Sequence, residues 1–196
     1  MKLLFLGDVM GRAGRTAVIE RLPKLREAWK LDFVVVNAEN SASGMGMTGP
    51  IATEIFAAGA DCITLGDHAF DQKDMISYIG TDARILRPLN YSKAAPGMGA
   101  KVFEATRGRR VQVVQALGRV FMSRPYDDPV PMVEAALKTA PLGGAVQATI
   151  LDFHAEATSE KMAMGRIVDG RASLVVGTHT HVPTADAMIL NRGTAY

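Results

Sequence analysis

The sequence predicts an α/β fold, because short apolar runs typical of buried strands alternate with longer runs of helical character. Three strand and helix pairs come first, and the polar residues that end the strands form a recurring pattern. The predicted strands are 2–8, 32–40 and 61–70, and the predicted helices are 16–30, 50–59 and 71–80, with Asp71 as the expected cap of the last helix. Such alternation favours a parallel sheet covered by helices.

The middle of the chain changes character. Residues 101–117 read as two strands around the turn 107–110, an antiparallel hairpin that could begin a second sheet. After the loop 123–131 comes a predicted helix at 132–140. The alternation then resumes with a strand at 146–156, a helix at 159–168, a strand at 172–180 and a short segment at 187–196.

Composition narrows the class of protein. At 196 residues, 48% of them hydrophobic, the chain suits one domain with a sizeable core. A net charge of +2 gives no broad basic field of the kind that drives nonspecific nucleic-acid binding. Cys62 is the single cysteine, and its apolar surroundings in the sequence predict a buried thiol in the core. No apolar run approaches membrane-spanning length, and the run 3–6 is too short for a secretory signal, so we expect a cytoplasmic protein.

Acidic, amide and imidazole side chains stand at the carboxyl ends of five predicted strands. Parallel strands bring their carboxyl ends to one edge of a sheet, where ligands bind, so these residues are expected to converge. They are Asp8, Glu39 and Asn40, Asp67 and His68, His154, and His179 and His181.

The two last histidines indicate a metal site. Residues i and i+2 of an extended segment face the same side, so His179 and His181 can both point at one object. Imidazole and carboxylate together suit a transition metal. Six candidate ligands are enough for two ions that share a bridging carboxylate, a centre suited to phosphoryl transfer and attractive to an anionic phosphodiester. These residues alone do not exclude a carbonyl compound as the substrate.

Each residue also has a plainer interpretation. His154 alone would more often be a hydrogen-bonded structural histidine, Asp8 a helix cap and Asp67 a turn residue. The Gly-rich loop 41–49 contains no lysine and is a weak phosphate signal, and the basic turn 107–110 reads as a solvated hairpin tip. All four histidines nevertheless fall at strand ends together with acids, which favours the joint metal interpretation.

Five sequence blocks resemble a known family. GDVMGRAGR, NAEN followed by SASGMGMTGP, GDHAFD, DFHAEATSEK and GTHTHVPTAD are similar, in order and spacing, to the signature blocks of bacterial calcineurin-like metallophosphoesterases of the YmdB-like branch. The similarity runs from the first residue to the end of the chain. It implies a four-layer α/β/β/α sandwich and a centre of two divalent or mixed-valence ions, iron or manganese. The implied activity is hydrolysis of 2′,3′-cyclic nucleotides to 3′-nucleotides.

The resemblance also implies a role for each candidate residue. One ion would be held by Asp8 and His181 and the other by His154 and His179, with Glu39 as the bridge and Asp67 completing the second site. Asn40 would contact the substrate phosphate, and His68 would act as the catalytic group on the leaving oxygen. Attack on phosphorus would come from a hydroxide held between the ions.

Two departures from the family pattern matter. The third block normally begins Gly-Asn-His, whereas this chain has Gly66-Asp67-His68, and the extra negative charge should reduce the Lewis acidity of the ions. Activity would then fall while metal binding survives. Relatives also continue past a GTAY-like segment, so we interpret residues 1–196 as one metallophosphoesterase domain that lacks their C-terminal segment.

Two other functions stay open. One is a phosphomonoesterase or broader nuclease that uses the same centre. The other is a catalytically weakened regulatory protein of RNA turnover, whose candidate partner would be another RNA-turnover protein. A homo-oligomer is a candidate assembly, and no membrane partner is expected.

Overall fold

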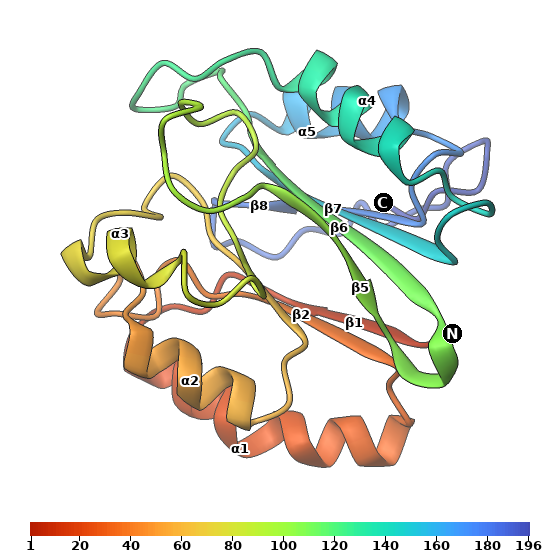
Figure 1. Ribbon diagram of the computed structural model, residues 1–196. Coiled ribbons are helices and arrows are strands. Elements are labelled where there is room, and N and C mark those ends of the chain that lie inside the picture. Colours follow the sequence, from red (N-terminus) through yellow and green to blue (C-terminus); the bar gives the residue numbers. More distant parts are fainter. The chain divides into compact units, whose positions relative to one another are not determined.

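The computed structural model describes residues 1–196, which divide into two compact units. The first unit contains residues 1–87 and 96–98, and the second contains residues 88–95 and 99–196. Each unit carries its own four-stranded sheet, so the predicted α/β fold with a second sheet is confirmed (Figure 1). None of the helices has the length and apolar character needed to cross a membrane.

The first unit is built on a parallel sheet. Its strands follow chain order and are β1 (Leu3–Leu6), β2 (Phe33–Asn37), β3 (Cys62–Thr64) and β4 (Ile85–Leu86). The connecting helices are α1 (Gly11–Trp29), α2 (Gly49–Ala57) and α3 (Lys73–Tyr78). Figure 1 shows α1 and α2 side by side on one face of this sheet. All five residues of β2 are buried, as expected of an interior strand in a parallel sheet.

Helix ends in the first unit follow local chemistry. Pro50 stands in the first turn of α2, where its missing N–H costs no hydrogen bond. Lys30 ends α1 in the left-handed conformation and donates its N–H to the carbonyls of Arg26 and Glu27. Strand β4 was not predicted, because two residues are too few to produce a periodic pattern.

The second unit has a mixed sheet. Its strands are β5 (Ala100–Glu104), β6 (Arg110–Leu117), β7 (Ala148–His154) and β8 (Leu174–Thr178), in that order. The predicted hairpin is confirmed: β5 and β6 are antiparallel around the short 3₁₀ turn η1 (Thr106–Gly108), whereas β6, β7 and β8 run parallel. Helices α4 (Pro129–Thr139) and α5 (Thr158–Ile167) cover one face (Figure 1).

Alternate strand residues of the second unit build the core beneath α4 and α5. Phe153 and Leu151 of β7 pack there with Val133 of α4 and Met164 of α5. Helix α4 begins at Pro129, three residues before the predicted start, because the side chain of Asp128 accepts the N–H of Val130 and caps the first turn.

A buried acid fastens the last residues of the chain to this unit. The carboxylate of Asp169 accepts the N–H groups of Arg192 (2.9 Å) and Thr194 (3.3 Å). The Thr194 hydroxyl in turn donates to the carbonyl of Ala172 (2.7 Å). Burial alone would raise the pKa of Asp169, but the hydrogen bonds from Arg192 and Thr194 outweigh it and lower the pKa.

Replacing Asp169 with asparagine is expected to lower the thermal unfolding midpoint at neutral pH. A lowered pKa in the folded state means that the carboxylate stabilises the fold at pH values above its unfolded pKa, and that this contribution is lost as the pH falls through the folded pKa. The difference between the two proteins should therefore shrink below about pH 4. Thermal unfolding followed by circular dichroism between pH 8 and pH 3 measures it, and a difference that is independent of pH would contradict the interpretation.

Candidate metal centre

In the first unit, the loops after β2 and β3 are tied together around Glu39. This side chain is fully buried, and its carboxylate accepts the backbone N–H of His68 and the side-chain amide of Asn40, both at 3.2 Å. The N–H of Glu39 donates to the side chain of Asn37 (3.3 Å), which lies at the end of β2. The loops therefore hold the carboxylate in a fixed position.

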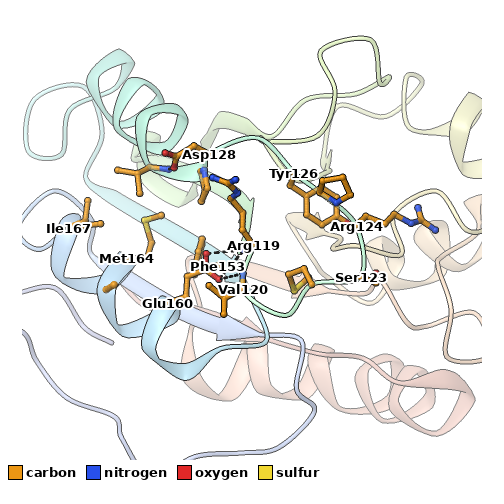
Figure 2. Close-up of a pocket in the computed structure, with 15 residues that line it drawn as sticks. Arg119, Val120, Ser123, Arg124, Tyr126, Asp128, Phe153, Glu160, Met164 and Ile167 are labelled. Atoms are coloured by element: carbon orange, nitrogen blue, oxygen red, sulfur yellow. Dashed lines mark hydrogen bonds between the residues drawn. The ribbon is translucent and has the colours of Figure 1, made fainter.

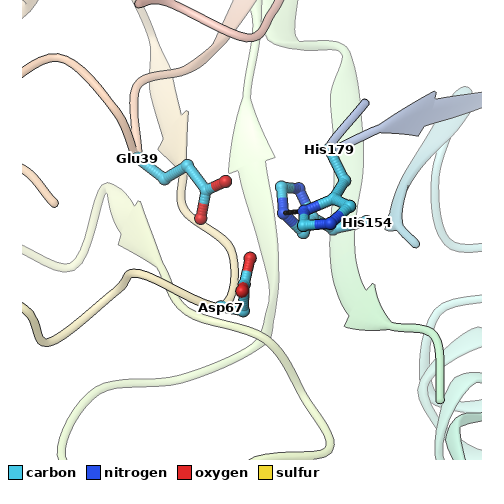
Figure 3. Close-up of side chains that lie close together, drawn as sticks. All are labelled: Glu39, Asp67, His154 and His179. Atoms are coloured by element: carbon cyan, nitrogen blue, oxygen red, sulfur yellow. Dashed lines mark hydrogen bonds between the residues drawn. The ribbon is translucent and has the colours of Figure 1, made fainter. Parts of the chain in front are cut away.

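A second carboxylate lies close to the first. Asp67, 6% exposed, has a carboxylate oxygen within 4.8 Å of one from Glu39, and both groups point toward the same space (Figure 3). Two buried negative charges at this distance disfavour each other and are costly to remove from water. A bound cation would remove that cost, so this pair of acids fits a metal ion.

His68 points its ring at a different acid. Its Nδ1 lies 2.7 Å from the carboxylate of Asp71, and its Nε2 lies 4.0 Å from that of Asp67. Burial alone would lower the pKa of His68, but the hydrogen bond to Asp71 and the charges of Asp67, Glu39 and Asp71 together raise it. The prediction that Asp71 caps the third helix is wrong: Gln72 stands at the cap position and its side chain does not bond to the helix, whereas Asp71 orients His68.

In the second unit, two imidazoles meet at the carboxyl ends of β7 and β8. His154 is the last residue of β7 and fully buried, and His179 follows the end of β8. The Nε2 of His154 and the Nδ1 of His179 are 3.1 Å apart, and the rings meet edge to face with centroids 4.9 Å apart (Figure 3). The other nitrogen of His179 lies 3.3 Å from the carboxylate of Glu156.

The spacing of these two nitrogens fits a shared ion. Imidazole nitrogens bind zinc-like ions at about 2.0–2.1 Å, so two of them at tetrahedral to octahedral angles are separated by roughly 2.9–3.4 Å. The observed separation of 3.1 Å falls in this range. An ion bound between His154 and His179 would therefore replace the proton of this hydrogen bond, because an imidazole nitrogen must be deprotonated to bind a metal.

The backbone after β8 differs from the predicted extended segment. Strand β8 ends at Thr178, and both His179 (φ 104°) and His181 (φ 53°) have positive φ. The prediction that His179 and His181 share one face of an extended strand is therefore wrong, because the chain turns at His179. Positive φ in residues other than glycine costs roughly 1–3 kcal/mol each and is concentrated at functional sites.

The six predicted ligands divide into two sets. One set is a group of acidic and imidazole side chains that could hold a metal ion. It consists of Glu39, Asp67, His154 and His179. Asp8 and His181 lie outside this group: Asp8 is half-buried two residues after β1, and His181 is exposed.

The comparison with known proteins identifies the family of this chain. The family model described as YmdB-like protein matches residues 4–196. The chain belongs to this family. The 2′,3′-cyclic-nucleotide 2′-phosphodiesterase of Bacillus subtilis (strain 168) is 44% identical to it over 200 aligned positions, which cover all of this chain and 73% of the relative.

Solved structures support the YmdB-like fold. A crystal structure of a protein from Thermus thermophilus superposes with a TM-score of 0.91 at 41% identity, covering all of this chain and 74% of that one. A crystal structure of a phosphatase from Mycoplasma pneumoniae superposes with a TM-score of 0.89 at 34% identity, covering all of this chain and 70% of that one. Both likenesses extend over the two units of the YmdB-like chain.

The second unit of this YmdB-like protein has a pocket of about 670 Å³ whose lining contains no histidine (Figure 2). Phe153, Met164 and Ile167 line it on the side of α5. Glu160 spans its edge and accepts the backbone N–H groups of Arg119 (2.9 Å) and Val120 (3.1 Å). Neighbouring residues of a strand face opposite sides of the sheet, so Phe153 opens to the helix side and His154 to the other. This pocket is not the metal centre.

Sequence reasoning missed the residues that orient the histidines of the YmdB-like chain. His154 contacts Thr178, which contacts Asp152, and His68 contacts Asp71. A signal for Asp152 was present: it stands two residues before His154 in a predicted strand, so both side chains face the same side. Thr178 carried no such signal, because its contact with His154 depends on the register between β7 and β8.

Proposed function

We propose that this protein is a metal-dependent phosphodiesterase that hydrolyses 2′,3′-cyclic nucleotides to 3′-nucleotides. The observation that carries the proposal is the set of Glu39, Asp67, His154 and His179, whose carboxylates and imidazoles suit a transition metal. The 44% identity to a protein named 2′,3′-cyclic-nucleotide 2′-phosphodiesterase supports the choice of substrate.

The proposed ligands of the metal are Glu39, Asp67, His154 and His179. Asp8 and His181 would hold a second ion, to which Glu39 would also be a ligand, and iron or manganese is the proposed metal. When bound, the ions supply Lewis acidity and activate water at neutral pH.

The residues beside the ligands act on the substrate. The Asn40 amide lies next to Glu39, where it can donate to a phosphoryl oxygen. His68 acts as general acid: Asp71 occupies its Nδ1, which leaves the Nε2–H to protonate the departing ribose 2′-oxygen. Cleavage of the bond between phosphorus and the 2′-oxygen then leaves the phosphate on the 3′-oxygen.

A substrate panel tests the proposed reaction. We expect the metal-loaded protein to convert 2′,3′-cyclic AMP to 3′-AMP, to release little phosphate from 3′-AMP, and to stop when a chelator removes the metal. Product identity is read by liquid chromatography. Release of inorganic phosphate from 3′-AMP at a comparable rate would favour a phosphomonoesterase, and cleavage of oligonucleotides at a comparable rate would favour a nuclease.

Asp67 favours the second candidate function, a weakened centre in a regulatory protein of RNA turnover. It stands where the resemblance described above leads us to expect asparagine, and its added charge would lower the Lewis acidity available to the substrate. Replacing Asp67 with asparagine is expected to raise turnover of bis-p-nitrophenyl phosphate about tenfold or more, because one negative charge leaves the centre while an oxygen ligand stays. Metal content measured on the same samples should be unchanged.

The outcome separates the two candidates. Wild-type protein that binds metal without hydrolysis, together with activity restored in Asp67→Asn, supports the weakened centre. Turnover that falls in the variant supports Asp67 as a working ligand of an active enzyme.

We further propose that residues 1–196 act as one metallophosphoesterase domain. The cytoplasmic location, the oligomeric state and a partner in RNA turnover stay predictions.

A further inference from the structure

We propose that Asp152, acting through Thr178, is a positioning residue that fixes the tautomer of His154. The inference concerns the second unit alone. In it, the Nδ1 of His154 keeps its proton and the Nε2 presents a lone pair, as a metal ligand requires. The link to catalysis rests on the proposed function, whereas the tautomer is a property of the protein itself.

Strand register brings the three side chains together. His154 and Thr178 are direct partners in the parallel pair of β7 and β8, and Asp152 stands two residues before His154 on the same face of β7. The Nδ1 of His154 lies 2.9 Å from the hydroxyl oxygen of Thr178, and that hydroxyl lies 2.6 Å from the Oδ1 of Asp152. Asp152 and His154 are fully buried, and Thr178 is 5% exposed.

The direction of these hydrogen bonds follows from the donors that each group has. The hydroxyl of Thr178 has a single proton and donates it to the Oδ1 of Asp152. With that proton used, Thr178 can only accept from the ring of His154. The Nδ1 of His154 must therefore carry the proton, and the Nε2, which faces His179, is left as the acceptor.

The far side of Asp152 is also held. The side-chain amide of Gln115, buried on the neighbouring strand β6, donates to the Oδ2 of Asp152 at 3.4 Å. A buried carboxylate is costly unless hydrogen bonds satisfy it, and here both oxygens accept one. The relay Gln115, Asp152, Thr178 and His154 thus crosses three adjacent strands and orients the ring from behind.

Loss of the relay should weaken metal binding. Groups that hold the second nitrogen of a metal-binding histidine set its orientation and basicity, and their removal typically costs about 10–100-fold in metal affinity. Thr178→Val keeps the shape of the side chain and removes the hydroxyl. Thr178→Ser is the matched control, since it keeps the hydroxyl and loses only a methyl group.

The direct test is the tautomer of His154 in the full chain after removal of metal. Protein labelled with ¹⁵N in its histidines is examined by long-range ¹H–¹⁵N correlation spectra at a pH where the imidazoles are neutral, with His154 assigned from a His154→Gln spectrum. We expect the Nδ1–H form in the wild type and in Thr178→Ser, and a mixture of tautomers in Thr178→Val. In Asp152→Asn, where the amide can donate to Thr178 and reverse the relay, we expect the Nε2–H form.

A second readout is the affinity for Mn²⁺, measured by calorimetry on the metal-free proteins. Thr178→Val should bind about 10–100-fold more weakly, and Thr178→Ser within about threefold of the wild type. An Nε2–H form of His154 in the wild type, or unchanged tautomer and affinity in Thr178→Val, would overturn the proposal. If Thr178→Val does not fold, the wild-type and Asp152→Asn spectra still decide it. Failure to hydrolyse cyclic nucleotides would refute the proposed function and leave the tautomer result standing.

Discussion

Replacing His68 with alanine is expected to reduce turnover of 2′,3′-cyclic AMP by about 10²–10⁴-fold while the metal content persists. His68 lies one residue from a proposed ligand, and its ring is held by Asp71 rather than by the acids of the metal group. Loss of a positioned general acid slows leaving-group departure by about this factor and leaves the ligands in place. Steady-state kinetics combined with elemental analysis of the same samples makes the measurement.

Asp71→Asn provides the graded control for that experiment. The amide keeps a contact with the ring of His68 and removes the negative charge that orients and stabilises its protonated form. We expect a smaller loss of turnover than in His68→Ala, with the same metal content. Unchanged turnover in His68→Ala would exclude His68 as the general acid. A water molecule would then be the candidate proton donor to the leaving oxygen.

Replacing His154 with alanine is expected to deplete the metal and to reduce hydrolysis by several orders of magnitude. This side chain is fully buried at the end of β7, and its Nε2 and the Nδ1 of His179 are spaced for one ion. Elemental analysis and the rate at saturating Mn²⁺ are the measurements. Because the substitution also leaves a cavity, a matched control is needed.

Gln112→Ala is that control. Gln112 is likewise a buried polar residue of the same sheet, and its side-chain amide donates to the carbonyl of Ala136 in α4. Its loss should lower the unfolding midpoint without removing metal, since it contacts no proposed ligand. Equal metal loss in both variants would mean that general destabilisation, rather than coordination, explains the result for His154.

Much of the fold is predictable from the sequence because it depends on local patterns. The apolar runs 33–37 and 148–154 and the hairpin around residues 107–110 each carry their own signal, and all three form as predicted. Helix α4 begins earlier than its apolar pattern because a capping aspartate and a proline set its start. Boundaries of this kind depend on single side chains and not on periodicity.

The candidate site is predictable in composition and not in orientation. Placing ligands at strand ends needs only the strand pattern, and this identified Glu39, Asp67, His154 and His179. The turn at His179 was missed because positive φ is uncommon in residues other than glycine, and the apolar pattern of the strand continues up to this residue. The contacts of His68 with Asp71 and of His154 with Thr178 depend on loop geometry and strand register, which arise only in the folded chain.

The metal centre proposed at Glu39, Asp67, His154 and His179 underlies the other predictions. Crystals of the Mn²⁺-loaded protein, measured at the manganese absorption edge, test it directly through anomalous difference density. We predict a peak whose nearest ligands, at about 2.0–2.3 Å, include a carboxylate of Glu39 or Asp67 and a nitrogen of His154 or His179. A peak with ligands from one unit alone, or none near these four residues, would contradict the account.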